Sequence, residues 1–346
     1  MTSKLENFSV HYFLTRALFL GIGFSVVIGI SKQDSIIAFV LGTIIGLPFI
    51  LLLDKVQKYK GEKSLNDVLK EMKGLGLFLR IAFILFAIAL LCEGLTFIQL
   101  FAASFFLVRT PIWFISLPLI LLLIRITKNG PTTTFRVATC LFPISITLTI
   151  LSLCALCGYA NLENISPLFV TPPLGFLKSV FNYTALSVSP SIFMLITSKS
   201  KSIGSYLFSG FTLIAKMFLI IAIVGPVLAG VYRFPEYIIL KEIKILDFIE
   251  KIENIVALSW IFDVFIYLSM ASLMVKELIP KKGKNILHAV LLVACFFLSF
   301  LFIGKYYINE LYIYYVAPIF TSIIFILTIP TLFFYLKRKQ KSNKTN

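Results

Sequence analysis

Residues 12–30 read YFLTRALFLGIGFSVVIGI, an apolar run with Gly21–Gly23 near its middle. Its length suits a bilayer, because about 20 helical residues cross a hydrocarbon layer of about 30 Å. Residues 176–197 read FLKSVFNYTALSVSPSIFMLIT and carry the weak helix formers Ser187–Pro190 at the corresponding depth. Glycine and proline disfavour helix interiors, so both stretches predict membrane helices that are interrupted near the midplane.

Apolar runs, separated by charged or Pro-, Gly- and Asn-rich breaks, predict ten membrane spans. They cover approximately 12–30, 35–53, 77–107, 112–126, 134–157, 176–197, 203–229, 253–276, 285–303 and 312–336. Each interrupted span is the first in a group of five. Corresponding interruptions in two halves favour an inverted-repeat transporter fold, in which broken helices expose backbone groups to a ligand. The alternative is that glycine and proline only allow close helix packing.

The composition supports a multi-pass membrane protein. Of the 346 residues, 59% are hydrophobic and 14% are charged, and the mean hydropathy is +0.96. We therefore expect an all-α integral membrane protein with one transmembrane domain over 1–346. Helices 1–5 would occupy about 12–157, helices 6–10 about 176–336, and a basic cytoplasmic tail 337–346.

The net charge of +16 reflects topology, because most of the excess lies in short segments between apolar runs. This distribution argues against nucleic acid as a partner. The termini and alternate loops hold most of the Lys and Arg residues, so both termini are predicted to be cytoplasmic. The five cysteines read as buried thiols, and no cofactor, metal site or catalytic motif is predicted. The chain is therefore not expected to be an enzyme.

Two loops have amphipathic patterns. Residues 64–73 place Leu65, Val68, Leu69 and Met72 on one stripe behind a possible Ser64 cap, which predicts a short interfacial helix. Residues 233–253 alternate charged and apolar side chains. We expect this second loop to form an outer-face helix that covers the site or contacts a partner, with a plain solvated loop as the alternative.

The predicted ligand site lies around the two interruptions. Unwound backbone at residues 21–23 and 187–189 would offer N–H donors to a ligand carboxylate, and carbonyls and serine hydroxyls to an amino group. Glycine is suited to the first break because a side chain would hinder the approach of the ligand. The predicted ligand-binding residues are Gly21, Gly23, Phe24, Glu93, Asn182, Tyr183, Ser187 and Ser189.

Charged residues inside the spans form a second group of candidates, because an unpaired charge at mid-membrane costs at least about 2.5–3.5 kcal/mol. Arg16, Glu93, Lys216 and Asp263 should therefore face the protein interior, a partner or water. A Glu93–Lys216 pair is chemically sensible, but one sequence cannot establish that the two meet. The predicted ion-coupling or charge network consists of Lys216, Asp263, Ser269 and Ser272.

Several short motifs occur in a characteristic order. They are Gln33-Asp34, Gly61-Glu62-Lys63-Ser64-Leu65, Arg136 with Pro143, Asn164-Ile165-Ser166-Pro167-Leu168, and Lys251-Ile252-Glu253-Asn254-Ile255 followed by Trp260. In this order, and with ten spans, they resemble the B subunits of spore germinant receptors, in the amino acid–polyamine–organocation superfamily. The match covers nearly the whole chain, although the pocket residues of that family are too variable to carry over.

The resemblance implies a LeuT-like 5+5 inverted repeat with broken helices 1 and 6. It also implies a germinant-binding membrane subunit, with an amino acid as the expected germinant. The expected partners are an A-type membrane subunit, a C-type lipoprotein and the lipid bilayer. The expected location is the spore inner membrane or the cell membrane. A proton- or sodium-coupled amino acid transporter is the alternative function, which composition and periodicity support equally.

Overall fold

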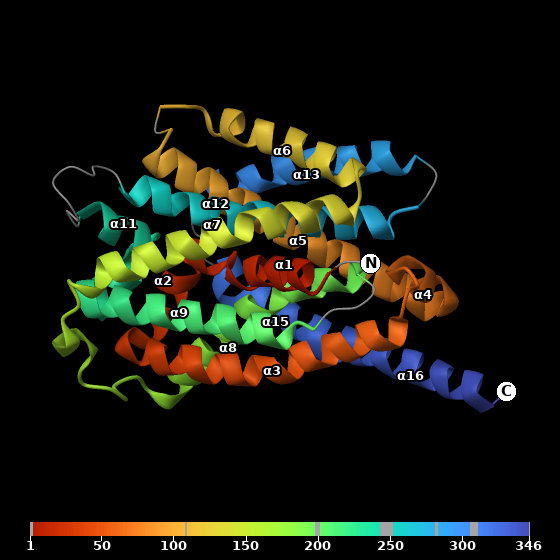
Figure 1. Cartoon of the computed structure of the whole chain (residues 1–346), viewed down its shortest axis with the longest axis horizontal. Helices are drawn as coiled ribbons and strands as arrows, with labels where there is room; N and C mark the ends of the chain where they lie inside the picture. The colour runs from red at the N-terminus through yellow and green to blue at the C-terminus, as the bar shows by residue number, and fades with distance from the viewer. Residues whose placement is uncertain are drawn as a thin grey trace.

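The computed structural model describes residues 3–107, 109–197, 201–242, 252–280, 283–304 and 311–345, and these form a bundle of helices (Figure 1). Eight helical segments among them are long and apolar enough to cross a membrane. The polar half-helix α1 (Lys4–Arg16) and the 17-residue α6 (Ile112–Lys128) occupy the two remaining positions of the predicted ten-span order.

The first group of five comprises the interrupted first span and four further helices. The first span is α1, a π-helical turn η1 (Phe19–Gly23) and α2 (Phe24–Ser31). The other helices are α3 (Ser35–Lys60), α5 (Lys73–Phe105), α6 and α7 (Pro131–Cys157). A 3-10 turn, η2 (Lys32–Asp34), joins α2 to α3, and another, η3 (Leu162–Ile165), follows α7.

The second group of five begins with α8 (Pro173–Val188), which continues as the 3-10 helix η4 (Ser189–Ile196). It is followed by α9 (Ile203–Val224), short α10 (Pro226–Val231), α11 (Pro235–Glu242), α12 (Ile252–Leu278) and α13 (Lys284–Gly304). The last span comprises η5 (Tyr312–Val316), α15 (Ala317–Ile323), η6 (Ile324–Thr328) and α16 (Ile329–Thr345).

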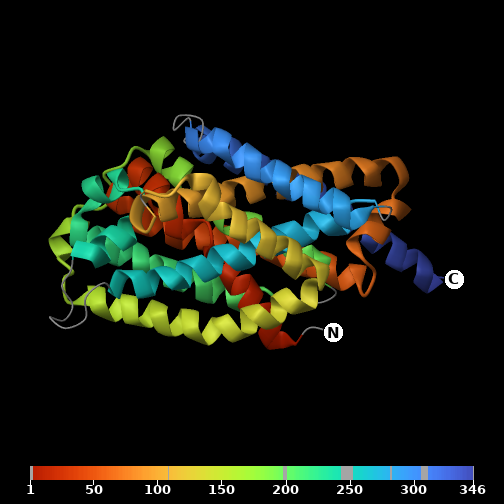
Figure 2. The same cartoon turned by 90° about the horizontal axis from the view of Figure 1, so that it is seen from above.

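The half-helix α1 lies in the interior of the bundle, in contact with α7, α9 and α12 (Figures 1 and 2). From Ser9 to Arg16 its side chains are buried, although several of them are polar. A polar helix at membrane depth must be surrounded by protein, because lipid offers no hydrogen bonds. The outer helices α6 and α13 instead expose apolar side chains such as Phe114 and Phe297.

Several predicted boundaries differ in the structure: the first span begins at Lys4 and the second extends to Lys60. The third span begins earlier, at Lys73, and the seventh ends earlier, because Gly225 has a φ of 80° and starts the separate helix α10. Gly at such a left-handed position is a common helix stop. The basic tail after residue 336 continues α16 as a helix up to Thr345.

Two of the motifs that carried the family resemblance bind each other. The carboxylate of Asp34 accepts hydrogen bonds from the backbone N–H groups of Phe169 (2.6 Å) and Thr171 (2.8 Å). The side chain of Gln33 donates to the carbonyl of Pro167 (2.7 Å). These bonds tie the loop before α8 to the end of the first span, so the end of the first interrupted span and the start of the second are held together.

A short helix is present where the interfacial helix is predicted, as α4 (Leu65–Glu71). The side chain of Ser64 accepts a hydrogen bond from the N–H of Asp67, as the expected cap. Part of the predicted outer-face helix is present as α11, while residues 243–251 of that loop lie outside the described residues.

Candidate functional site

The first interruption is a change of helix type. After Ala17 and Leu18 the chain forms the π-helical turn η1, in which the N–H of Gly23 donates to the carbonyl of Leu18 (3.2 Å). A Cβ atom on Gly23 would lie 2.5 Å from that same oxygen, so the turn requires glycine at this position. Gly21 belongs to the same turn. The predicted unwound backbone is thus replaced by π-helical hydrogen bonds, a geometry that is frequent at functional sites.

Aromatic side chains surround this turn. Phe24 stacks on Phe39 with ring centroids 5.7 Å apart, and Tyr183 lies 4.1 Å from Phe39 and 5.0 Å from Phe19. The hydroxyl of Tyr183 shares a hydrogen bond with Thr43 (2.8 Å). The predicted site residues Phe24 and Tyr183, 159 positions apart in sequence, therefore lie in one cluster against the first break.

The second interruption also changes helix type, from α to 3-10 at Ser189. The hydroxyl of Ser187 donates to the carbonyl of Thr184 (3.0 Å) and also meets Tyr206 (3.1 Å), while that of Ser189 donates to the carbonyl of Leu186 (3.4 Å). Both predicted hydroxyl ligands are therefore engaged by the protein, as is common in membrane helices. Ser191, which sequence reasoning missed, is buried, and its hydroxyl has no partner among the described residues.

Among the buried side chains without hydrogen bonds to any described residue, four lie on the helices α5, α8, η4 and α12 near the interruptions. They are Glu93 on α5, Asn182 on α8, Ser191 on η4 and Ser269 on α12. Asn182 precedes the aromatic cluster residue Tyr183, and α5 contacts the turn η1. Buried polar groups normally have partners, so each of these calls for an explanation such as a ligand.

A buried ion pair joins the first and eighth spans. Arg16 and Asp263 are both fully buried, with 3.3 Å between a guanidinium nitrogen and a carboxylate oxygen. Arg16 also donates to the hydroxyl of Thr149 on α7 (3.1 Å) and lies over the ring of Tyr12. Asp263 was a predicted network residue. Arg16 was singled out in the sequence only as a charge within a span, and its pairing with Asp263 became visible in the structure.

Lys216 pairs with Glu236 of α11, not with Glu93. The distance from the Lys216 ammonium to the Glu236 carboxylate is 2.6 Å, and Ser152 donates to the same oxygen (3.1 Å). This corrects the pairing considered from sequence, because α11 folds back over the bundle and brings its carboxylate to Lys216. Glu93 lies elsewhere, on α5.

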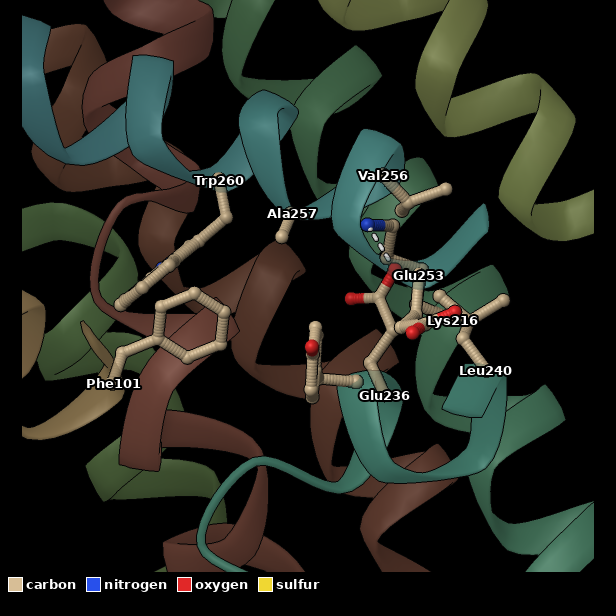
Figure 3. Close-up of a pocket in the computed structure, with 9 residues that line it drawn as sticks. Phe101, Lys216, Glu236, Leu240, Glu253, Val256, Ala257 and Trp260 are labelled. Carbon is tan, nitrogen blue, oxygen red and sulfur yellow. Dashed lines mark hydrogen bonds and ion pairs between the residues drawn. The ribbon is translucent and has the colours of Figure 1, made fainter. Parts of the chain in front are cut away.

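Glu236 lines a small cavity beneath α11 (Figure 3). Its volume of about 30 Å³ matches one water molecule. Two carboxylates and one ammonium line it, together with apolar walls, and its lining residues are Phe101, Lys216, Glu236, Tyr237, Leu240, Glu253, Val256, Ala257 and Trp260. The predicted outer helix thus covers a charged cavity.

The remaining predicted network residues do not join these pairs. The Ser272 hydroxyl meets the imidazole of His288 on α13 (2.9 Å). Ser269 has no hydrogen-bond partner among the described residues. Within the part of the chain that the structure describes, no group of three His, Cys, Asp or Glu side chains could hold a metal ion.

The ion pair between Lys216 of α9 and Glu236 of α11, hereafter the latch, holds α11 against the bundle and gives a testable consequence. We expect Glu236→Gln to speed amide hydrogen exchange in Pro235–Glu242, because the Lys216 ammonium loses the carboxylate that holds α11 down. Glu253→Gln is the control: it lines the same cavity and has no ion pair among the described residues. Equal exchange rates in wild type and Glu236→Gln would contradict the latch.

An all-helical membrane bundle with two interrupted spans and ion pairs between buried helices is a transporter-type fold. Solved structures agree. The chain is similar to MhsT in complex with L-phenylalanine (TM-score 0.57, 17% identity, covering 93% of this chain and 88% of that one). It is also similar to a manganese transporter of Eremococcus coleocola (TM-score 0.53, 11% identity, 95% and 78%). The fold is the predicted LeuT-like 5+5 inverted repeat.

A family model described as "Spore germination protein" matches residues 7–305. The chain therefore belongs to the spore germination protein (Spore_permease) family, as the motifs predicted. It is 24% identical over 239 residues to YfkT of Bacillus subtilis (strain 168), whose name marks it as a candidate spore germination protein. That match covers 67% of this chain and 66% of YfkT, slightly less than two thirds of that protein.

Proposed function

We propose that this protein is the ligand-binding membrane subunit of a spore germinant receptor, and that it recognises an amino acid between its two interrupted spans. The observation that carries the proposal is the set of unpartnered polar groups on Glu93, Asn182, Ser191 and Ser269. In a family of spore germination proteins, a germinant is the ligand that these groups would bind.

The chemistry of these groups suits an amino acid. An ionised Glu93 carboxylate only accepts hydrogen bonds, so it would suit the ammonium of a zwitterion, which would also supply the opposite charge that this buried group lacks among the described residues. The amide of Asn182 and the hydroxyls of Ser191 and Ser269 both donate and accept, so they could bind the ligand carboxylate. The Tyr183 cluster would form the wall around the ligand side chain. MhsT was solved with an amino acid bound, which supports this ligand class.

The partners and orientation belong to the same proposal. We infer an A-type membrane subunit and a C-type lipoprotein as partners, and the inner membrane of the spore as the location. Both termini would be cytoplasmic, because the two termini and the alternate loops, which lie on the same side of the membrane, hold most of the basic residues.

Asn182→Leu separates ligand recognition from folding. Neither polar atom of the Asn182 amide bonds to a described residue, so an apolar side chain of similar size should leave the unfolding temperature equal or higher. If this amide binds the germinant, removing it leaves a polar group of the ligand unpaired and should raise the half-maximal germinant concentration about tenfold or more. The measurement is the germination response of spores to each candidate amino acid.

Asn66→Leu is the matched control. Asn66 is buried with an unpartnered carbonyl oxygen, but it lies on α4 at the end of the bundle, away from the interruptions. It should leave the response unchanged. An unchanged dose response in Asn182→Leu spores with wild-type protein levels would contradict the ligand site.

Uptake distinguishes a receptor from a transporter. Proteoliposomes containing the purified chain alone, under a proton or sodium gradient, should accumulate no labelled amino acid if the protein only senses its ligand. Gradient-dependent accumulation that Asn182→Leu abolishes would establish the same ligand site but assign it to a coupled transporter.

A further inference from the structure

A second candidate site lies between the interfacial helix α4 and the start of α5. There a crevice of about 140 Å³ is lined by Leu69, Lys70, Lys73, Gly76, Leu77 and Arg80, hereafter the basic crevice. The helix α4, which forms one wall of the crevice, lies at the end of the bundle that carries both termini (Figure 1). Three cationic side chains around one small cavity indicate an anionic ligand.

Close packing shapes the basic crevice. A Cβ atom on Gly76 would lie 1.7 Å from the carbonyl oxygen of Leu69, so only glycine lets α4 approach α5 this closely. The Nε atom of Arg80 donates to the carbonyl of Leu278 at the end of α12. This bond anchors the guanidinium and leaves its two terminal nitrogens available for a ligand.

The positive charge of the basic crevice is uncompensated. Among the described residues, no carboxylate forms an ion pair with Lys70, Lys73 or Arg80. The adjacent Glu71 is already engaged by Lys339 and Lys63, at 2.5 and 2.8 Å. Their hydrogen bonds, that of Lys339 foremost, hold the pKa of Glu71 below its usual range, so this carboxylate is ionised and committed to other lysines.

The position along α5 indicates where the anion comes from. With 33 residues, α5 is about 50 Å long and exceeds the hydrocarbon layer of about 30 Å, and the charges of Lys73 and Arg80 on its first turns favour headgroup depth for this end. Leu77 and Phe78 are 57% and 65% exposed on these turns. Apolar side chains beside a basic cavity suit an amphiphile whose chains run along α5 and whose headgroup enters the crevice.

We propose that the basic crevice binds the phosphate of an anionic phospholipid headgroup. The Arg80 guanidinium matches two phosphate oxygens, and Lys70 and Lys73 add point charges. No side chain caps the first turn of α5, and Lys73, the first residue of this helix, lines the crevice. Binding would fix α4 against α5 on the membrane surface.

Native mass spectrometry of the purified full chain in detergent tests the proposal, with phosphatidylglycerol, phosphatidylcholine and inorganic phosphate as probes. We expect one tightly retained phosphatidylglycerol per chain. Lys70→Ala/Lys73→Ala/Arg80→Ala should weaken its binding roughly a hundredfold, because three interfacial charges are lost. Lys70→Gln/Lys73→Gln, which keeps the Arg80 anchor, should weaken it roughly tenfold or more.

Lys55→Ala/Lys58→Ala/Lys128→Ala is the matched control, since it removes three exposed cations from the ends of α3 and α6. It should retain the lipid. Equal retention of phosphatidylcholine, or equal losses in the control and both crevice variants, would overturn the site. Inorganic phosphate that binds as tightly as the lipid would overturn the assignment to a lipid headgroup.

Discussion

Asp263→Asn is expected to destabilise the protein by about 3–5 kcal/mol, the usual effect of removing one partner from a buried ion pair. Arg16 and Asp263 are both 0% exposed, so the remaining guanidinium would be buried, with the Thr149 hydroxyl and the Tyr12 ring as its stabilising neighbours among the described residues. Arg16→Gln should have an effect of similar size. Denaturant or thermal unfolding of the purified protein in detergent measures both.

The double variant Arg16→Gln/Asp263→Asn separates the pair from its individual members. It leaves no uncompensated charge, so it should recover a large part of the lost stability. The exposed pair of Lys63 and Glu71 is the control, because its side chains are 51% and 32% exposed. Lys63→Gln should change stability by less than about 1 kcal/mol. A double variant as unstable as the sum of the single variants would show that the two side chains act independently.

The Arg16–Asp263 pair also bears on function. It connects α1, just before the first interruption, to α12, so the half-helix α1 can tilt only together with α12 or after the pair separates. The charge of Asp263 is therefore balanced by Arg16 of the protein itself. A role for Asp263 in binding a coupling cation would require Arg16 to move away first.

Gly23→Leu is expected to abolish or severely weaken the response to the germinant. The carbonyl oxygen of Leu18 would lie 2.5 Å from the new Cβ atom, so the backbone of η1 must shift. Overpacking of this kind costs about 1–3 kcal/mol, which corresponds to about 5- to 150-fold in ligand affinity if the shift falls on the binding-competent state. The half-maximal germinant concentration for spore germination measures the effect.

Gly204→Leu makes the same substitution at a helical glycine with open space. Among the described residues outside its own helix turn, no atom lies within 4 Å of a Cβ at Gly204, on the first turn of α9. This variant should respond like the wild type. Wild-type protein levels and an unchanged dose response in Gly23→Leu would show that the first interruption does not contribute to the site. The related Gly21→Leu prediction stands on sequence alone.

Much of the fold could be predicted from sequence because the bilayer imposes a local rule. A span needs about 20 apolar residues in one run, so ten spans and their 5+5 grouping can be found without knowing any contact. The same holds for α4, because Ser64 and a stripe of apolar side chains define a capped amphipathic helix by themselves. The interruptions at Gly23 and Ser189 could also be predicted, because a residue of low helix propensity weakens the helical turn in which it lies.

The partners of the buried polar residues required the tertiary structure. Lys216 pairs with Glu236, and Arg16 pairs with Asp263, because helix rotation, depth and the fold of α11 bring these atoms together. None of those quantities is a property of one segment. For the same reason sequence could nominate Ser187 and Ser189 but could not show that nearby protein groups already engage their hydroxyls, while Asn182 and Ser191 are left without partners among the described residues. The length of an apolar run depends on consecutive residues and can be found in the sequence. The pairing of polar groups depends on how separate helices pack, which only the tertiary structure decides.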